Sequence, residues 1–418
     1  MPLGSERIAQ FTPLIVAMSW GLSLALHHPF VGWTIYSDVV SFWVREEHLQ
    51  EGRIPCIEYF FEYPPSACYL TYAARLLGGQ DLTGYYLAFS LLSLPAFLAI
   101  GYVLQRMSRE VNPLAFVFAF SPSLVVYGIY NFDHFLAALL GLSIIALTSG
   151  RWKLASLLLG LSVSVKLMTV LLLPLYLLEG KGRRLEAFTM FVVGAGIPTL
   201  PVLLLNPSWF LEFVRYHGGW GLENAWYIWI FQDPFSPTAK VFGVMLLVPL
   251  LLRSYTAALP VGTRSLLTVS SWLLTAYIFT PQMFLWLIPL MPFSVVALYF
   301  WPIIDIANMY IILTWFTTNH PTLPWTLPQT MSLIRAIALA FTYYFTLKAN
   351  FKSPSLLKFN RTMCTEDRLI YRSTNDLFDN FLHNTTRMQP RFVLRCSTIK
   401  KYFFSIDNRS SAELNLYR

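Results

Sequence analysis

The chain has 418 residues, of which 56% are apolar or aromatic and 12% are charged, against roughly 25% charged residues in an ordinary soluble domain. Together with a mean hydropathy of +0.52, this composition excludes a water-soluble globule. The net charge of +8 does not indicate nucleic-acid binding, because residues 348–418 alone hold 13 of the 30 Lys and Arg but only 6 of the 22 Asp and Glu.

Long uncharged runs recur through residues 8–347, and about 20 apolar residues suffice for one helix to cross a bilayer. They predict an all-α polytopic membrane protein, a bundle of about 11–13 membrane segments. The clear runs are Ile8–Leu26, Leu82–Leu104, Pro113–Tyr130, Phe135–Thr148, Ala187–Leu205, Ser265–Thr280 and Met283–Phe300. The weaker runs are Leu154–Val165, Leu167–Leu178, Pro237–Leu252, Ile303–Thr317 and Met331–Leu347.

The positive charges between these runs predict an orientation. If the N-terminus is cytoplasmic, the two long loops His27–Gln80 and Asn206–Ser236 lie outside, with Pro65–Leu77 as an interfacial helix. The inner connections then carry nine Lys and Arg and the outer ones four, as the positive-inside rule requires. The inner nine are Arg106, Arg109, Arg151, Lys153, Lys181, Arg183, Arg184, Arg253 and Arg264, and the outer four are Arg45, Arg53, Arg75 and Arg215.

The composition changes at residue 347, which divides the chain into a transmembrane domain of residues 1–347 and a basic tail of residues 348–418. We expect the tail to be cytoplasmic, and either poorly ordered or a small appended element. Its three Asn-x-Ser/Thr sequences, at Asn360, Asn384 and Asn408, would then remain unmodified.

Two charges stand out inside or beside apolar runs, where each costs at least about 2.5 kcal/mol at a helix centre. Lys166 divides residues 154–178 into two short halves, which favours a re-entrant turn near the outer face, although a lysine can also snorkel to an interface. Asp133 precedes the run that starts at Phe135. It is either a functional carboxylate or an ordinary N-terminal helix residue stabilised by the helix dipole.

The first long loop holds the best candidate for a general base. Asp38 precedes an amphipathic run, Val39–Gln50, that can lie in the membrane interface. A carboxylate that is partly desolvated there gains proton affinity and can accept a proton from a substrate; a solvated loop carboxylate is the alternative. Cys56 and Cys68 can form a disulfide if this loop faces an oxidising compartment, although no cysteine spacing indicates a metal site.

Several segments in this order resemble one family. The pattern resembles the GT-C glycosyltransferases that use polyprenyl-phosphate sugars, above all the prokaryotic mannosyltransferase group, and the similarity runs from about Tyr36 to Pro289. The segments are Ser37-Asp38 followed by Gly52 and Pro55, Glu62-Tyr63-Pro64-Pro65, Asn131-Phe132-Asp133, Lys166 with the later Pro174, and Thr280-Pro281-Gln282 through Pro289.

The resemblance implies an inverting transferase in which Asp38 is the catalytic base. Cationic groups would bind the donor phosphate, and polar groups would bind the sugar and the acceptor. The phosphate candidates are Lys166, Arg215 and His217; the sugar and acceptor candidates are Glu62, Tyr63, Asp133, Glu223 and Gln282. The chain departs from the family pattern at Trp220, where an Arg is common, and at Glu223-Asn224, where a Glu-Ser pair is common. His217 is alternatively a polar residue of an exposed loop.

The predicted activity is transfer of a hexose, mannose by resemblance, from a polyprenyl-phosphate carrier to a glycolipid or glycan acceptor. The active site would lie on the extracytoplasmic face of a multi-pass cell-membrane protein, with membrane lipids as its surroundings and no nucleic-acid partner. The arrangement requires no metal, although weak dependence on divalent cations is left open. A multi-pass transporter or carrier of lipid-linked substrates is the main alternative, and a non-catalytic scaffold is a third.

Overall fold

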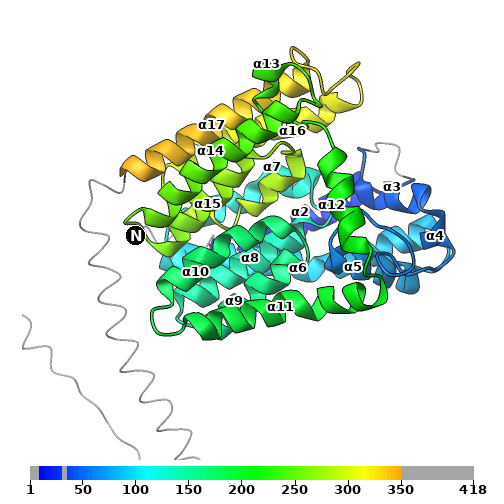
Figure 1. Cartoon of the computed structure of the whole chain (residues 1–418), viewed down its shortest axis with the longest axis horizontal. Coiled ribbons are helices and arrows are strands. Elements are labelled where there is room, and N and C mark those ends of the chain that lie inside the picture. The colour runs from blue at the N-terminus through cyan, green and yellow to red at the C-terminus, as the bar shows by residue number, and fades with distance from the viewer. Residues whose placement is uncertain (1–8, 31–34, 350–418) are drawn as a thin grey trace, which may run out of the picture. The chain divides into compact units, whose positions relative to one another are not determined.

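The computed structural model describes residues 9–30 and 35–349 of the chain. These residues fold into helices joined by loops, and no β-strand occurs among them (Figure 1). The all-α polytopic fold expected from the sequence is therefore confirmed. Apart from its first two residues, the predicted tail of residues 348–418 lies outside the described residues, as do Asn360, Asn384 and Asn408.

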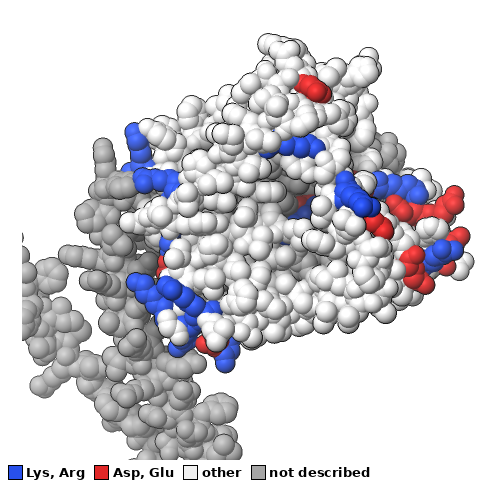
Figure 2. All heavy atoms as spheres, in the orientation of Figure 1, with Lys and Arg blue, Asp and Glu red and all other residues white. Residues whose placement is uncertain are grey.

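Five helices are long and apolar enough to cross a membrane: α6 (Leu82–Glu110), α11 (Arg184–Leu205), α14 (Pro237–Thr256), α16 (Ala297–Trp315) and α17 (Leu327–Ala349). Shorter apolar segments are α2 (Thr12–Leu26), α8 (Asp133–Thr148), α9 (Trp152–Val163), and η2 (Leu167–Leu172) with α10 (Leu173–Glu179). Figure 2 shows most charged side chains toward the left and right sides of one face, with a largely uncharged band between them. Such a band is what hydrocarbon requires of a protein surface.

Two expected spans are not continuous helices. Residues 113–130 form η1 (Ala115–Phe120) and α7 (Pro122–Val126), and residues 281–296 form η3 (Pro281–Trp286) and η4 (Met291–Phe293) before α16 begins. Prolines interrupt both runs, and a proline inside a helix removes a backbone hydrogen bond. Most of these residues are buried within the protein, so their hydrophobicity reflects the core of the bundle. Neither run is therefore one continuous helix.

Glycines bring α9 and α11 into close contact. A Cβ on Gly160 would lie 2.1 Å from the carbonyl oxygen of Phe191, and one on Gly194 would lie 2.2 Å from that of Leu157. Small residues of this kind let membrane helices approach backbone to backbone. The segment that precedes Lys166 is therefore anchored on a rigid helix pair.

The long loops contribute short helices at one end of the bundle. They are α3 (Asp38–Arg45), α4 (Glu47–Gln50), α5 (Pro65–Gly78), α12 (Trp209–Gly219) and α13 (Ile228–Phe231). Figure 1 shows α3, α4 and α5 gathered together, and α12 running between them and the rest of the bundle. Arg75 of α5 donates to the carbonyl oxygens of Leu49, Gln50 and Gly79 at 2.8–3.1 Å. This arginine therefore ties α5 to the end of α4. The helix predicted at residues 65–77 is present as α5.

Candidate active site

A single cavity of about 580 Å³ brings together most of the predicted site residues. Its polar lining comes from both long loops and from the break at Lys166. The predicted residues in the lining are Asp38, Glu62, Tyr63, Lys166, His217, Glu223 and Gln282. Two predicted residues, Asp133 and Arg215, are not in it.

Asp38 is placed by the apolar face of its helix. Val39, Phe42 and Trp43 are buried, and the Phe42 ring stacks at 5.8 Å on Phe132. The Ser37 hydroxyl donates to the carbonyl oxygen of Ile129 at 3.1 Å. Because these contacts fix the start of α3, the Asp38 carboxylate is directed into the cavity.

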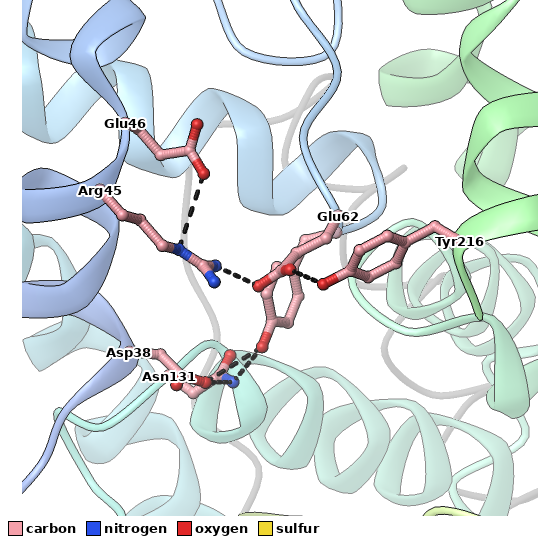
Figure 3. A network of polar contacts seen from close by, with 7 residues as sticks. Asp38, Arg45, Glu46, Glu62, Asn131 and Tyr216 are labelled. Atoms are coloured by element: carbon pink, nitrogen blue, oxygen red, sulfur yellow. Dashed lines mark hydrogen bonds and ion pairs between the residues drawn. The ribbon is translucent and has the colours of Figure 1, made fainter. Parts of the chain in front are cut away.

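Two side chains donate hydrogen bonds to Asp38. The Tyr63 hydroxyl lies 3.1 Å and the Asn131 amide nitrogen 2.6 Å from Oδ2, and that nitrogen also lies 2.7 Å from the Tyr63 hydroxyl oxygen (Figure 3). Burial, with a smaller contribution from the negative charge of Glu62, raises the pKa of Asp38 to about 6. The group can therefore hold a proton close to neutral pH and still be ionised at pH 7, as a general base requires.

Lys166 reaches the same part of the cavity from the break between α9 and η2. Its backbone is extended (φ −151°, ψ 125°) between these two helices, so the predicted turn at this lysine is present. Nζ lies 3.7 Å from Oδ2 of Asp133 and 4.6 Å from the centre of the Tyr63 ring, and the side chain is 14% exposed. The lysine does not snorkel away; it stands beside the residues that surround Asp38.

Asp133 supports Lys166 from behind the cavity wall. It is the first residue of α8, it is fully buried, and its Oδ1 accepts a hydrogen bond of 2.6 Å from the Trp286 indole. The residue begins a helix, as one of the two interpretations expected, and it also pairs with a cation. It does not line the cavity and contacts Lys166 from outside the lining.

Glu62 occupies the rim of the cavity. Arg45 donates to one of its carboxylate oxygens and the Tyr216 hydroxyl donates to the other (Figure 3). Arg45 also lies 3.6 Å from the Glu46 carboxylate. Tyr216 belongs to α12 and Arg45 to α3, so Glu62 joins the two long loops through side chains.

The second long loop supplies the opposite wall. The backbone of Glu223 pairs with the segment before Pro281: its nitrogen donates to Tyr277 at 2.9 Å and its carbonyl oxygen accepts from Phe279 at 2.8 Å. Burial raises the pKa of Glu223 to about 7, and the Asp38 charge contributes in the same direction. Gln282, 5% exposed, presents a buried Oε1 without a hydrogen-bond partner among the described residues.

The two other predicted phosphate ligands differ in position. His217 lines the cavity, its Nδ1 lies 3.0 Å from the carbonyl oxygen of Phe213, and burial lowers its pKa. Arg215 is exposed and is not among the residues that line the cavity. The structure thus brings His217, but not Arg215, to the cavity that contains Lys166.

One side of the cavity is apolar. It is formed by η2 and by the end of α15 (Val261–Thr275) with the residues that follow. The residues are Leu167, Met168, Val170, Leu171, Trp272, Ala276, Ile278 and Met283. Leu167 and Val170 are each more than 40% exposed, so this side continues onto the outer surface of the helical domain.

A disulfide closes the part of the first loop that carries Glu62 and Tyr63. Cys56 and Cys68 are bonded, with their Cα atoms 6.0 Å apart, which lies in the usual range for a disulfide. The sequence offered this pairing as one alternative, and the structure contains it. The 12-residue separation makes a compact loop around the aromatic and acidic residues of the rim.

Sequence reasoning missed three contributors. Arg45 lines the cavity and pairs with Glu62. Tyr216 and the Trp286 indole hold Glu62 and Asp133. All three bind partners more than 15 residues away in sequence, which local sequence patterns do not reveal. Within residues 9–30 and 35–349, no group of three or more His, Cys, Asp and Glu is arranged to hold a metal ion.

The sequence matches a family model over more than half of its length. The sequence model described as "Glycosyltransferase family 87" matches residues 60–282, more than half of the 418 residues. A search of curated proteins found no match. The matched region contains Glu62, Tyr63, Lys166 and Glu223, whereas Asp38 precedes it.

Proposed function

The chain belongs to glycosyltransferase family 87, and from this premise we propose that it transfers a hexose from a polyprenyl-phosphate carrier to a glycolipid or glycan acceptor. The resemblance to GT-C glycosyltransferases is confirmed by this membership, which also favours an enzyme over a transporter. The observation that carries the proposal is that Asp38, Lys166 and an apolar wall line one cavity.

The proposed reaction is a single inverting displacement. Asp38 takes the proton from an acceptor hydroxyl as the hydroxyl oxygen attacks the anomeric carbon. The bond from that carbon to the phosphate oxygen breaks, and its electron pair stays with the phosphate. Phosphate leaves without protonation, so its growing negative charge needs a cation. Lys166 is assigned to this charge, with His217 as a hydrogen-bonding partner. Arg215 is proposed as a weaker, peripheral contribution because it is exposed.

The donor tail fits the apolar side of the cavity. Leu167 and Leu171 of η2 line this side together with Trp272 and Ala276, and η2 begins directly after Lys166. A lipid chain leaving a phosphate bound at Lys166 therefore finds apolar contacts within one helical turn. The exposed side chain of Val170 continues the path toward the bilayer.

Sugar and acceptor are assigned to the remaining polar groups. Glu62, Tyr63, Glu223 and Gln282 all face the cavity, and carboxylates and amides can accept hydrogen bonds from several hydroxyls. The raised pKa of Glu223 suits a neutral carboxyl that donates as well as accepts. Mannose is favoured through the family resemblance alone.

Two features support an extracytoplasmic site. The disulfide between Cys56 and Cys68 suits an oxidising compartment. The connections assigned to the inner side carry nine Lys and Arg and those assigned to the outer side four, as the positive-inside rule requires. Both features support a cavity at the membrane face away from the cytoplasm, with the N-terminus and the tail inside.

The test is a reconstituted assay. Purified protein in liposomes receives polyprenyl-phosphate mannose labelled in the sugar, together with a lipid extract as a source of acceptors. We expect label to appear in an acceptor with inverted anomeric configuration, and D38N to abolish transfer while it retains donor binding. The matched control is E47Q, which removes an exposed carboxylate from the same loop. Full activity in D38N would refute the role of Asp38, and retention of configuration would refute the mechanism.

A further inference from the structure

Helix α17 carries a buried polar stripe inside the membrane domain. Gln329, Ser332 and Arg335 are at most 1% exposed, and their three-residue spacing places them on one helix face. All three donate to Asn224: Gln329 and Ser332 to its side-chain oxygen at 3.4 and 3.0 Å, and Arg335 to its backbone carbonyl at 3.2 Å. A buried arginine in an apolar helix is costly, which indicates that this stripe has a task.

Arg335 also holds the segment before Gln282. One of its Nη atoms donates to the carbonyl oxygen of Phe279, and the guanidinium carbon lies 3.6 Å from the centre of the Phe279 ring. The other Nη atom donates to Asn308 of α16 at 2.7 Å, and Asn308 in turn donates to the carbonyl oxygen of Pro281 at 2.8 Å. Arg335 and Asn308 thus bind three backbone carbonyls.

These carbonyls belong to the two segments that form the sugar-facing wall. The backbones of Glu223 and Phe279 are hydrogen-bonded to each other. Arg335 binds the carbonyl oxygen of Asn224 in the first segment and that of Phe279 in the second. Glu223 and Gln282 line the cavity, whereas Arg335, Asn308 and Ser332 do not. The stripe therefore lies behind the wall, on the side away from the substrate.

We propose that Arg335 is a positioning residue that fixes the wall carrying Glu223 and Gln282 by binding its backbone from behind. This inference rests on the proposed function for its effect on transfer. It extends the machinery beyond residues 60–282, the region matched by the family model, because α17 and Asn308 both follow that region. It also explains why a fully buried arginine persists in α17.

The first experiment tests the position of Glu223 without any assay of transfer. Glu223→Cys is introduced where Cys364 and Cys396 are replaced by serine, and its reaction with a water-soluble methanethiosulfonate is timed. R335M is expected to change this rate several-fold. The matched control is R264M, which removes another buried arginine that binds a backbone carbonyl, that of Tyr255 at 3.1 Å, and does not line the cavity. An unchanged rate in R335M overturns the proposal.

The second experiment measures transfer. Misplacement of a substrate-positioning group can cost about a hundredfold in rate, so R335M is expected to lower kcat/KM at least about tenfold per folded molecule. In a double-mutant cycle, R335M combined with E223Q should be little worse than R335M alone, because a displaced residue 223 no longer makes the contact that E223Q weakens. A purely structural defect, expected of R264M, would instead add fully to E223Q.

Outcomes separate the two proposals. If R335M does not accumulate in folded form, R335K takes its place, since lysine keeps the charge but lacks the planar fork of donors. If the wild-type protein transfers no sugar from polyprenyl phosphate, the proposed function fails, and the labelling rates alone decide the role of Arg335. If the wild type is active while R335M and E223Q are additive, the function stands and the positioning role is rejected.

Discussion

The two polar walls of the cavity are held in different ways. On the wall of Asp38 and Lys166, side chains bind side chains, through Tyr63, Asn131 and Asp133. On the wall of Glu223 and Gln282, the backbone is held from behind, and Gln282 Oε1 has no hydrogen-bond partner in the part of the chain that the structure describes. Buried polar atoms are normally satisfied.

The difference suggests a division of labour. A wall whose polar groups already hold one another is preorganised for charge that develops during reaction. A wall with an unsatisfied buried acceptor is suited to a ligand that brings donors, such as sugar hydroxyls. Substitutions on the wall of Asp38 and Lys166 should therefore reduce kcat. Substitutions on the wall of Glu223 and Gln282 should also raise KM.

The largest effect is expected for Asp38. D38N keeps the shape of the side chain but removes the base, and general-base catalysis contributes about 10²- to 10⁴-fold. We expect kcat to fall by this factor while the KM for the donor changes little. Steady-state transfer in liposomes measures it, and a D38N enzyme that loses donor affinity but keeps kcat would remove the distinction between the walls.

The second largest effect is expected for substitution of Lys166. Removing one stabilising group for developing negative charge costs about 10²- to 10³-fold in kcat, so K166M is expected to lose that much. K166R should retain part of the activity because the charge remains. Since Asp133 is left buried and unpaired in K166M, thermal unfolding of each variant is recorded so that rates refer to folded protein. Equal activity of K166M and wild type would exclude the assigned role.

Glu223 should show a smaller effect of another kind. E223Q keeps a hydrogen-bonding group but cannot take up a negative charge, and a hydrogen bond to an uncharged partner contributes about 0.5–1.5 kcal/mol. We expect up to about a tenfold loss in kcat/KM, mostly through KM for donor or acceptor. A loss confined to kcat would place Glu223 with the reacting groups instead.

The smallest effect concerns pH. Asp38 must be ionised to act as a base, so activity should rise with pH through its pKa of about 6. The Glu62 charge raises the pKa of Asp38 and Lys166 lowers it, while Tyr36 and Tyr63 also lower it by hydrogen bonding. E62Q should therefore move the acidic limb to lower pH, and K166M should move it to higher pH. The pH profile of kcat/KM tests both, and shifts in the same direction would contradict the arrangement.

Parts of the site were predictable because single residues stood out against their surroundings. A lysine within an apolar run and a carboxylate before an amphipathic run are visible in sequence, and Lys166 and Asp38 line the same cavity. Arg335 and Asp305 are equally buried charges in α17 and α16, yet they escaped notice because each sits in a weaker apolar run. Ser121 and Ser123, which are far from Asp305 in the sequence, donate hydrogen bonds to its carboxylate.

The sequence by itself determined the membrane class and the all-helical fold, since both follow from local hydrophobicity and charge. Tertiary structure alone decided which apolar runs are core and which face lipid, because both environments favour the same side chains. It also decided the partners of Glu62, Asp133 and Asn224, because hydrogen bonds between residues far apart in the chain depend on how the helices pack and not on local composition.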